Sequence, residues 1–135
     1  MKKKIIISGG CGFIGSNLVE SLVNKFDIIV IDDLSVGTLE NIKKFKNKIK
    51  LIKKDINQIN SLNKKLFSNI YGFIHLAAKA EIVISSNQEL NYFDDNVRAV
   101  ISALTFCKKN NIEKFIFASS ASVYGNTGNK KVSEN

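Results

Sequence analysis

The sequence predicts a single α/β domain built on a doubly wound parallel sheet. Short apolar runs typical of buried strands alternate with stretches whose apolar residues recur at helical spacing, and this alternation repeats five times along the 135 residues. Strands that are joined through helices pair in parallel, and the crossovers between them are right-handed. We therefore expect the strand order 3-2-1-4-5, with the sheet truncated before the later strands that such folds carry.

The first two predicted strands flank a glycine-rich turn and a helix. Residues 5–7 form the first apolar run, residues 9–15 the turn, and residues 28–31 the second run. Between the runs, apolar residues at helical spacing give one face that can lie on a sheet, namely Ile14, Leu18, Val19, Leu22, Val23 and Phe26. A turn-rich segment at residues 32–37 and a short helical piece then lead to a third strand at residues 49–52.

The second half of the chain continues the same alternation. We expect a weak helix near residues 59–67, a fourth strand at 71–78, a long helix at 87–110 and a fifth strand at 114–118. The long helix has the most extended helical pattern. Its buried side is expected to carry Leu90, Phe93, Val97, Ile101, Leu104 and Phe106.

Composition argues against two classes of partner. Basic residues outnumber acidic residues by 20 to 12, but every basic residue except Arg98 is a lysine, whereas base readout in nucleic acids favours the arginine fork. We therefore expect no nucleic-acid partner. The lysines between residues 43 and 54 are interpreted as solvated flanks of the third strand, with a phosphate-binding patch as the alternative. No apolar stretch is long enough to span a membrane.

We expect a cytoplasmic protein. The lysines at residues 2–4 and the isoleucines after them look like the start of a signal peptide, but Ser8 and the glycines that follow it interrupt the apolar run. Cys11 and Cys107 follow no disulfide or metal-binding spacing, which is typical of a reducing compartment. Cys11 lies in the glycine turn, where we interpret it as a small filler, with an oxidation-sensitive group as the alternative.

The glycine turn predicts a cradle for a dinucleotide. Gly9, Gly12 and Gly15 have the spacing G-x-x-G-x-x-G, which provides one position for a tight turn, one for backbone approach to a pyrophosphate and one for close packing of helix on strand. The helix that begins here directs its unpaired N–H groups toward the phosphates, so no basic residue is needed. Because glycines occur in many turns, a plain connection between strand and helix is the alternative.

An acidic residue at the end of the second strand favours NAD as the ligand. Asp32 follows Gly12 by twenty residues, where a carboxylate can accept hydrogen bonds from both hydroxyls of an adenosine ribose. The 2′-phosphate of NADP would meet this carboxylate, and no arginine lies nearby to bind it.

The fourth predicted strand ends in small residues, Ala77 and Ala78, which allow a cofactor to come close. His75, the only histidine, precedes them in an apolar run without an adjacent nucleophile. We therefore interpret His75 as a packing residue, with a catalytic base as the alternative.

Six blocks in this order resemble the extended short-chain dehydrogenase/reductase family. In chain order they are Gly9 to Ser16, Asp32 to Ser35, Asp55-Ile56, His75 to Ala78, Asn96, and Ser119 to Gly125. The resemblance covers the whole chain and is greatest to the nucleotide-sugar epimerases and dehydratases. It implies a Rossmann fold with bound NAD, a nucleotide-sugar substrate for the full-length parent, and transient oxidation of the sugar at C4.

The same resemblance implies roles for individual residues. Ser120 would be the hydroxyl of the catalytic triad, with a serine-rich strand end as the alternative. No metal ion is implied. The residues expected to bind NAD are Gly9, Gly12, Phe13, Ile14, Gly15, Asp32, Asp33, Asp55, Ile56, Ala77, Ala78 and Asn96.

One part of the family pattern is absent from these 135 residues. The family's catalytic Tyr-x-x-x-Lys pair does not occur, because no tyrosine of the chain has a lysine four positions later. We therefore expect the chain alone to be inactive as an epimerase or dehydratase. The open alternatives are part of an epimerase, part of a 4,6-dehydratase or related enzyme, and a stand-alone NAD-binding module without catalysis.

The fifth strand is expected to form an edge of the sheet. Residues 115–118 are apolar, and the only charge beside them is Lys114. An apolar edge strand pairs readily with other chains, so self-association or a homo-oligomer is expected. We assign the domain to residues 1–125. The polar tail at 126–135 is interpreted as the start of the missing catalytic segment, with a fold-back cover for this edge as the alternative.

Overall fold

The computed structural model describes residues 2–79, 89–128 and 130–134. Its centre is a parallel sheet with the strand order β3-β2-β1-β4-β5, so the predicted topology is confirmed. The strands are β1 (Lys3–Ser8), β2 (Phe26–Asp32), β3 (Ile49–Lys53), β4 (Ile70–His75) and β5 (Phe115–Phe117).

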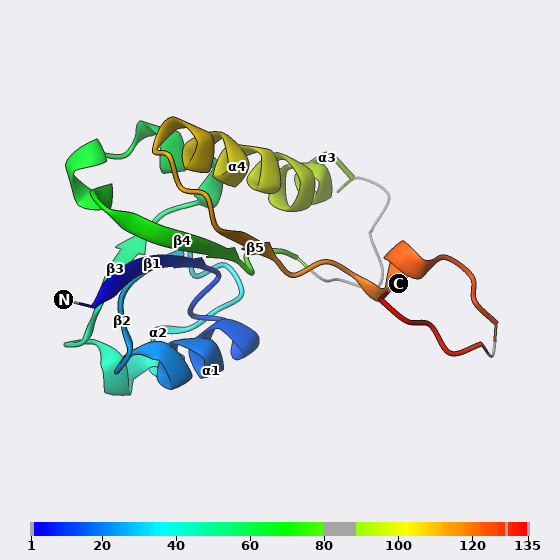
Figure 1. Cartoon of the computed structure of the whole chain (residues 1–135), viewed down its shortest axis with the longest axis horizontal. Coiled ribbons are helices and arrows are strands. Elements are labelled where there is room, and N and C mark those ends of the chain that lie inside the picture. Colours follow the sequence, from blue (N-terminus) through cyan, green and yellow to red (C-terminus); the bar gives the residue numbers. More distant parts are fainter. Residues whose placement is uncertain (1, 80–88, 129, 135) are drawn as a thin grey trace.

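Helices cover both faces of the sheet (Figure 1). One face carries α1 (Phe13–Leu22) and α2 (Leu39–Ile42), and the 3-10 turn η1 (Lys43–Phe45) continues α2. The other face carries α3 (Glu89–Phe93) and α4 (Ala99–Lys109), joined by the π-helical turn η4 (Asp94–Arg98). The 3-10 turns η2 (Ile56–Ser61) and η3 (Lys64–Phe67) lie on this second face, and η5 (Ala121–Tyr124) follows β5.

The apolar core consists of two layers, one on each side of the sheet. Successive side chains of a strand point to opposite faces, so Ile5 and Ile7 of β1 pack under α1 whereas Ile6 packs under α4. β2 divides its side chains in the same way. Because both faces are covered, the central strands are apolar without alternation, as parallel sheets require.

The apolar face predicted for the first helix is correct except at its two ends, and Phe26 lies beyond α1, at the first position of β2. Val19 and Val23 are buried, and Leu18 and Leu22 are half-buried against the same layer. Ile14 is 66% exposed, because it belongs to the first turn of α1, which borders the open glycine loop.

The long helix buries a different face from the one predicted. Only Phe106 of the expected residues is buried, whereas Leu90, Phe93, Val97, Ile101 and Leu104 are exposed. The prediction assumed a continuous α-helix, but η4 interrupts it with a wider turn, and the face that packs on the core carries Ala99, Ala103 and Cys107. Small alanines let α4 approach η2 and the sheet closely. The predicted start at residues 87 and 88 lies outside the described residues.

The segment predicted as a weak helix forms two short 3-10 turns instead. Asp55 accepts a hydrogen bond from the N–H of Asn57 at the start of η2 (2.8 Å), and Asn63 accepts one from the N–H of Lys65 at the start of η3 (3.0 Å). Such Asp and Asn caps offer the backbone a local partner and divide what would otherwise be one helix.

β5 lies at the edge of the sheet, as predicted. Ile116 is 61% exposed and Phe117 is 47% exposed. Within the described residues, β4 is the only strand that pairs with β5, and the segment after β5 runs away from the sheet (Figure 1). The described part of the tail therefore does not cover this edge. No helix among residues 2–79, 89–128 and 130–134 is long and apolar enough to cross a membrane.

Candidate functional site

The glycine loop between β1 and α1 has the geometry of an anion cradle. Gly9 adopts φ +72°, in the left-handed region that favours glycine, and its N–H donates to the carbonyl of Ile31 (2.9 Å). The N–H of Gly12 donates to the carbonyl of Gly9 (3.2 Å) and closes the turn. Gly12 is also the N-cap of α1, so the first N–H groups of the helix follow it directly.

Gly12 and Gly15 lack side chains for different reasons. A Cβ on Gly15 would clash with the carbonyl oxygen of Gly9 and lie 2.7 Å from the Cα of Gly10, so the helix can rest on the loop only without a side chain here. A Cβ on Gly12 would meet nothing nearer than 3.4 Å. The protein itself does not require glycine at position 12, so the open space there fits the close approach of a ligand.

Asp32 links the end of β2 to the glycine loop. Its Oδ2 accepts a hydrogen bond from the N–H of Cys11 (2.8 Å), and its Oδ1 accepts one from the N–H of Leu34 (2.9 Å). The second bond holds Leu34 at φ 65°, a left-handed conformation that costs a non-glycine residue about 1–2 kcal/mol. Asp32 is 7% exposed, and the remaining lone pairs of its carboxylate are available to ribose hydroxyls.

The turn after β2 packs against the glycine loop. Asp33 Oδ1 accepts hydrogen bonds from the N–H (2.9 Å) and the Oγ (2.7 Å) of Ser35, which shapes the turn. A Cβ on Gly37 would lie 2.6 Å from the carbonyl carbon of Cys11. The carbonyl of Cys11 in turn accepts a hydrogen bond from the N–H of Thr38 (3.2 Å). The turn and the glycine loop therefore form one continuous wall.

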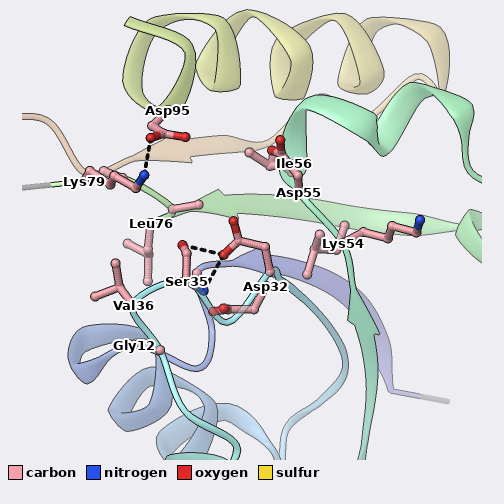
Figure 2. A pocket seen from close by; sticks show the side chains of 16 residues that line it. Gly12, Asp32, Ser35, Val36, Lys54, Asp55, Ile56, Leu76, Lys79 and Asp95 are labelled. Atoms are coloured by element: carbon pink, nitrogen blue, oxygen red, sulfur yellow. Dashed lines mark hydrogen bonds and ion pairs between the residues drawn. The ribbon is translucent and has the colours of Figure 1, made fainter. Parts of the chain in front are cut away.

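The opposite wall comes from the ends of β3 and β4. Asp55 and Ile56 follow β3 (Figure 2), and Ala77 and Ala78 follow β4. Lys54 also lines the cleft, but its side chain extends away from Asp32 (Figure 2). The cleft thus opens at the carboxyl ends of the four parallel strands β1 to β4, where ligands bind in this type of sheet.

The structure brings eight of the twelve predicted cofactor residues into this cleft. They are Gly9, Gly12, Asp32, Asp33, Asp55, Ile56, Ala77 and Ala78. Of the other four, Phe13 and Ile14 are exposed at the start of α1, Gly15 is buried behind the loop, and Asn96 contacts the main chain of Lys79. Sequence reasoning missed eight further residues that line the cleft, namely Ile31, Ser35, Val36, Gly37, Lys54, Leu76, Lys79 and Asp95.

Ser120 does not line the cleft. It is exposed at the start of η5, where its Oγ accepts a hydrogen bond from the N–H of Ser122 (3.2 Å) and donates one to the Oγ of Ser122 (3.1 Å). β5 ends shortly before Ser120, and the carboxyl end of this parallel strand lies on the same side of the sheet as the cleft.

Cys11 has the environment of a structural filler. It is fully buried in the glycine loop, and burial, with a smaller contribution from the charge of Asp32, raises the pKa of its thiol to about 12. A buried thiol that is protonated at neutral pH is a poor nucleophile. This environment supports the filler interpretation over the oxidation-sensitive one.

A glycine cradle at a helix N-terminus, a carboxylate at the end of β2 and small residues at the end of β4 define a dinucleotide-binding protein of the Rossmann class. A sequence profile described as "NAD dependent epimerase/dehydratase family" matches residues 5–135. The chain belongs to this family, and the cofactor of the family is NAD.

Several individual relatives are named as 4-epimerases. The bifunctional protein GAL10 of Candida maltosa is 37% identical over 128 residues, which are 89% of this chain and 83% of that sequence. The solved UDP-N-acetylglucosamine 4-epimerase of Methanobrevibacter ruminantium M1, in complex with UDP-N-acetylmuramic acid, is 35% identical with a TM-score of 0.87. The match covers 99% of this chain and 43% of the solved one.

A further solved structure carries the cofactor. The UDP-glucose 4-epimerase of Bifidobacterium longum, in complex with NAD+ and UDP, is 29% identical with a TM-score of 0.84. The match covers 98% of this chain and 41% of that structure. This chain therefore spans about two-fifths of the length of the solved epimerases that it resembles.

Proposed function

We propose that this chain supplies the NAD-binding part of a nucleotide-sugar epimerase of the UDP-glucose 4-epimerase kind. The observation that carries the proposal is the cleft itself. Gly12 leaves space that the protein does not fill, and Asp32 presents a carboxylate to the cleft at the end of β2, which supports binding of an adenosine ribose there. In such an enzyme the bound NAD supplies transient oxidation of the sugar at C4.

Within this proposal the residues of the chain bind and orient. The N–H groups that follow Gly12 hold the pyrophosphate, Asp32 and Asp33 hold the ribose end, and Asp55 and Ile56 flank the adenine. Ser120 orients the sugar hydroxyl from the segment after β5. The proton acceptor for that hydroxyl is not among the 135 residues, since the family's Tyr-x-x-x-Lys pair does not occur in them.

Asp32 provides the test of this proposal. We expect the wild-type chain to bind NAD more tightly than NADP, and Asp32→Ala to weaken NAD about tenfold or more, because hydrogen bonds to a charged acceptor contribute about 1.5–3 kcal/mol. The same substitution should weaken NADP much less, since its 2′-phosphate is repelled by the carboxylate. Isothermal titration calorimetry with both cofactors measures the preference.

The ratio of the two affinities separates binding from structural damage. Loss of the Asp32 bonds to Cys11 and Leu34 lowers both affinities together, whereas loss of the ribose contact changes their ratio. Asp27→Ala is the control, because Asp27 is exposed at the opposite end of β2. A wild-type chain that prefers NADP contradicts the ribose assignment.

We also propose that the exposed edge strand β5 causes the chain to self-associate. Ile116→Lys should raise the monomer fraction, because a charge on an edge strand opposes pairing with another chain. Light scattering across a range of concentrations measures this fraction. Val132→Lys is the matched control, since Val132 is a similarly exposed apolar residue that lies in the tail. A wild-type chain that stays monomeric at high concentration, with the amides of β5 protected from hydrogen exchange, contradicts this proposal.

A further inference from the structure

The π-helical turn η4 brings two side chains to the loop that follows β4. Asn96 Oδ1 accepts a hydrogen bond from the N–H of Lys79 (2.9 Å), and Asn96 Nδ2 donates one to the carbonyl of Lys79 (3.0 Å). The neighbouring Asp95 forms an ion pair with the ammonium group of Lys79 (2.7 Å). Both residues of η4 thus hold the same residue of the loop, and π-turns are frequent at functional sites.

The amide of Asn96 replaces a neighbouring strand. β4 leaves the sheet after His75, and the last sheet-like bond on this side runs from the N–H of Leu76 to the carbonyl of Ser8 (3.0 Å). Beyond that point, both backbone polar groups of Lys79 are satisfied by one side-chain amide, in the same donor and acceptor pattern that a strand would offer.

The loop held in this way is a wall of the cofactor cleft. Leu76 to Lys79 line the cleft, and the loop passes directly over the glycine turn, since a Cβ on Gly9 would lie 2.7 Å from the nitrogen of Ala77. Figure 2 shows Lys79 joined to Asp95 above Leu76, on the side of the cleft opposite Val36 and Gly12. Gly9 therefore fixes the loop at one end and Asn96 fixes it at the other.

We propose that Asn96 is a positioning residue, which sets the affinity for NAD by fixing the main chain of Lys79 and with it the Ala77–Lys79 wall. This role differs from the direct contact with NAD that the resemblance implies for Asn96. It rests on the proposed function, because the affinity that it sets is that of the NAD site.

The test combines calorimetry with hydrogen exchange on the 135-residue chain. Asn96→Ala should weaken NAD binding about tenfold, and in the free protein it should make the amide of Lys79 exchange faster, because both bonds to the loop are lost. Asn60→Ala is the matched control, since Asn60 Nδ2 donates to the carbonyl of Ser102 in α4 (3.0 Å) but does not line the cleft. It should lower the melting temperature and change NAD affinity less than about twofold.

Asn96→Asp keeps the size of the side chain and one of the two bonds. Its carboxylate still accepts from the N–H of Lys79 but repels the carbonyl, so we expect protection of the Lys79 amide and an NAD affinity between those of wild type and Asn96→Ala. This variant carries the test if Asn96→Ala does not fold.

Two results overturn the inference. In the first, Asn96→Ala loses NAD affinity while the Lys79 amide of the free protein exchanges as in wild type, which shows direct contact. In the second, the amide exchanges faster while NAD affinity is unchanged, which shows that the wall need not be fixed. Failure of the proposed function is distinct from both, because the wild-type chain itself then shows no NAD binding.

Discussion

Gly15→Ala should destabilise the fold by about 3 kcal/mol, a large part of the 5–15 kcal/mol that holds a typical domain together. The added Cβ would clash with the carbonyl oxygen of Gly9 and lie 2.7 Å from the Cα of Gly10. Both contacts are with backbone, which cannot rotate away as a flexible side chain can. Relief requires α1 to move off the sheet, and Val19 and Val23 then lose their burial.

Gly12→Ala is the matched variant, and its expected effect is the opposite. Its Cβ has no contact nearer than 3.4 Å, and Gly12 has φ −74° and ψ 177°, which alanine adopts without strain. Stability should therefore change by less than about 1 kcal/mol. NAD affinity should fall about tenfold or more, because the methyl group occupies the space through which the backbone approaches the pyrophosphate.

Urea denaturation and NAD titration of the two variants together decide the roles of these glycines. The expected pattern is a destabilised Gly15→Ala and a stable Gly12→Ala that binds NAD poorly. A Gly12→Ala variant that binds NAD like wild type would mean that the pyrophosphate does not approach this position. A Gly15→Ala variant of wild-type stability would mean that α1 can shift at little cost.

The topology was predictable from sequence because it depends on a few strong rules. Residues 5–7 and 28–31 are apolar at every position. Such continuous runs are typical of strands that are covered on both faces of a sheet. The helical stretches between them force parallel pairing with right-handed crossovers. Among doubly wound sheets, the glycine turn after the first strand favours the dinucleotide-binding order 3-2-1-4-5.

The packing of the long helix was not predictable by the same reasoning. Periodicity selects the large apolar residues as the buried face, but here Ala99 and Ala103 pack on the core while Ile101 and Leu104 are exposed. A large residue gains more from burial, yet a helix can approach the sheet closely only through small residues. The π-turn before Ala99 also rotates every preceding residue about the helix axis relative to a regular α-helix. No residue type in the sequence predicts such a turn.

The candidate site was predictable where a single segment carries both the sequence motif and the position at a strand end that the motif needs. The glycine loop and Asp32 are of this kind, since each stands at the end of a strand. Gly37 and Lys79 were missed because they reach the cleft through contacts between separate segments, Gly37 with Cys11 and Lys79 with Asn96. From the sequence, Gly37 is predicted only to belong to a turn.

His75 is the buried group with the largest expected effect of pH on stability. It is 1% exposed at the end of β4, and its Nδ1 lies 2.7 Å from the Oγ of Ser8. Its ring lies against the rings of Phe115 and Phe117, with centroids 6.2 and 5.8 Å away. Its Nε2 has no hydrogen-bond partner among the described residues. A proton on this ring therefore places a charge in an apolar layer.

Burial lowers the pKa of His75 from 6.5 to about 4. Between these values the unfolded chain binds a proton that the folded chain does not, so acidification favours unfolding. The part of the free energy of unfolding that comes from neutral His75 is fully present above pH 6.5. It falls as the pH drops toward 4 and is lost below that pH. A shift of this size corresponds to about 3 kcal/mol.

Urea denaturation at pH 7 and at pH 4 measures this loss, and His75→Asn isolates it from the titration of the carboxylates. The asparagine keeps a polar group next to Ser8 but does not titrate, so the variant is less stable at pH 7 and loses about 3 kcal/mol less than wild type on acidification. The titration of His75 by NMR gives the folded pKa directly. Equal losses in the two proteins, or a folded pKa near 6.5, would show that the ring takes up its proton without cost, and that water or a polar group reaches Nε2 in solution.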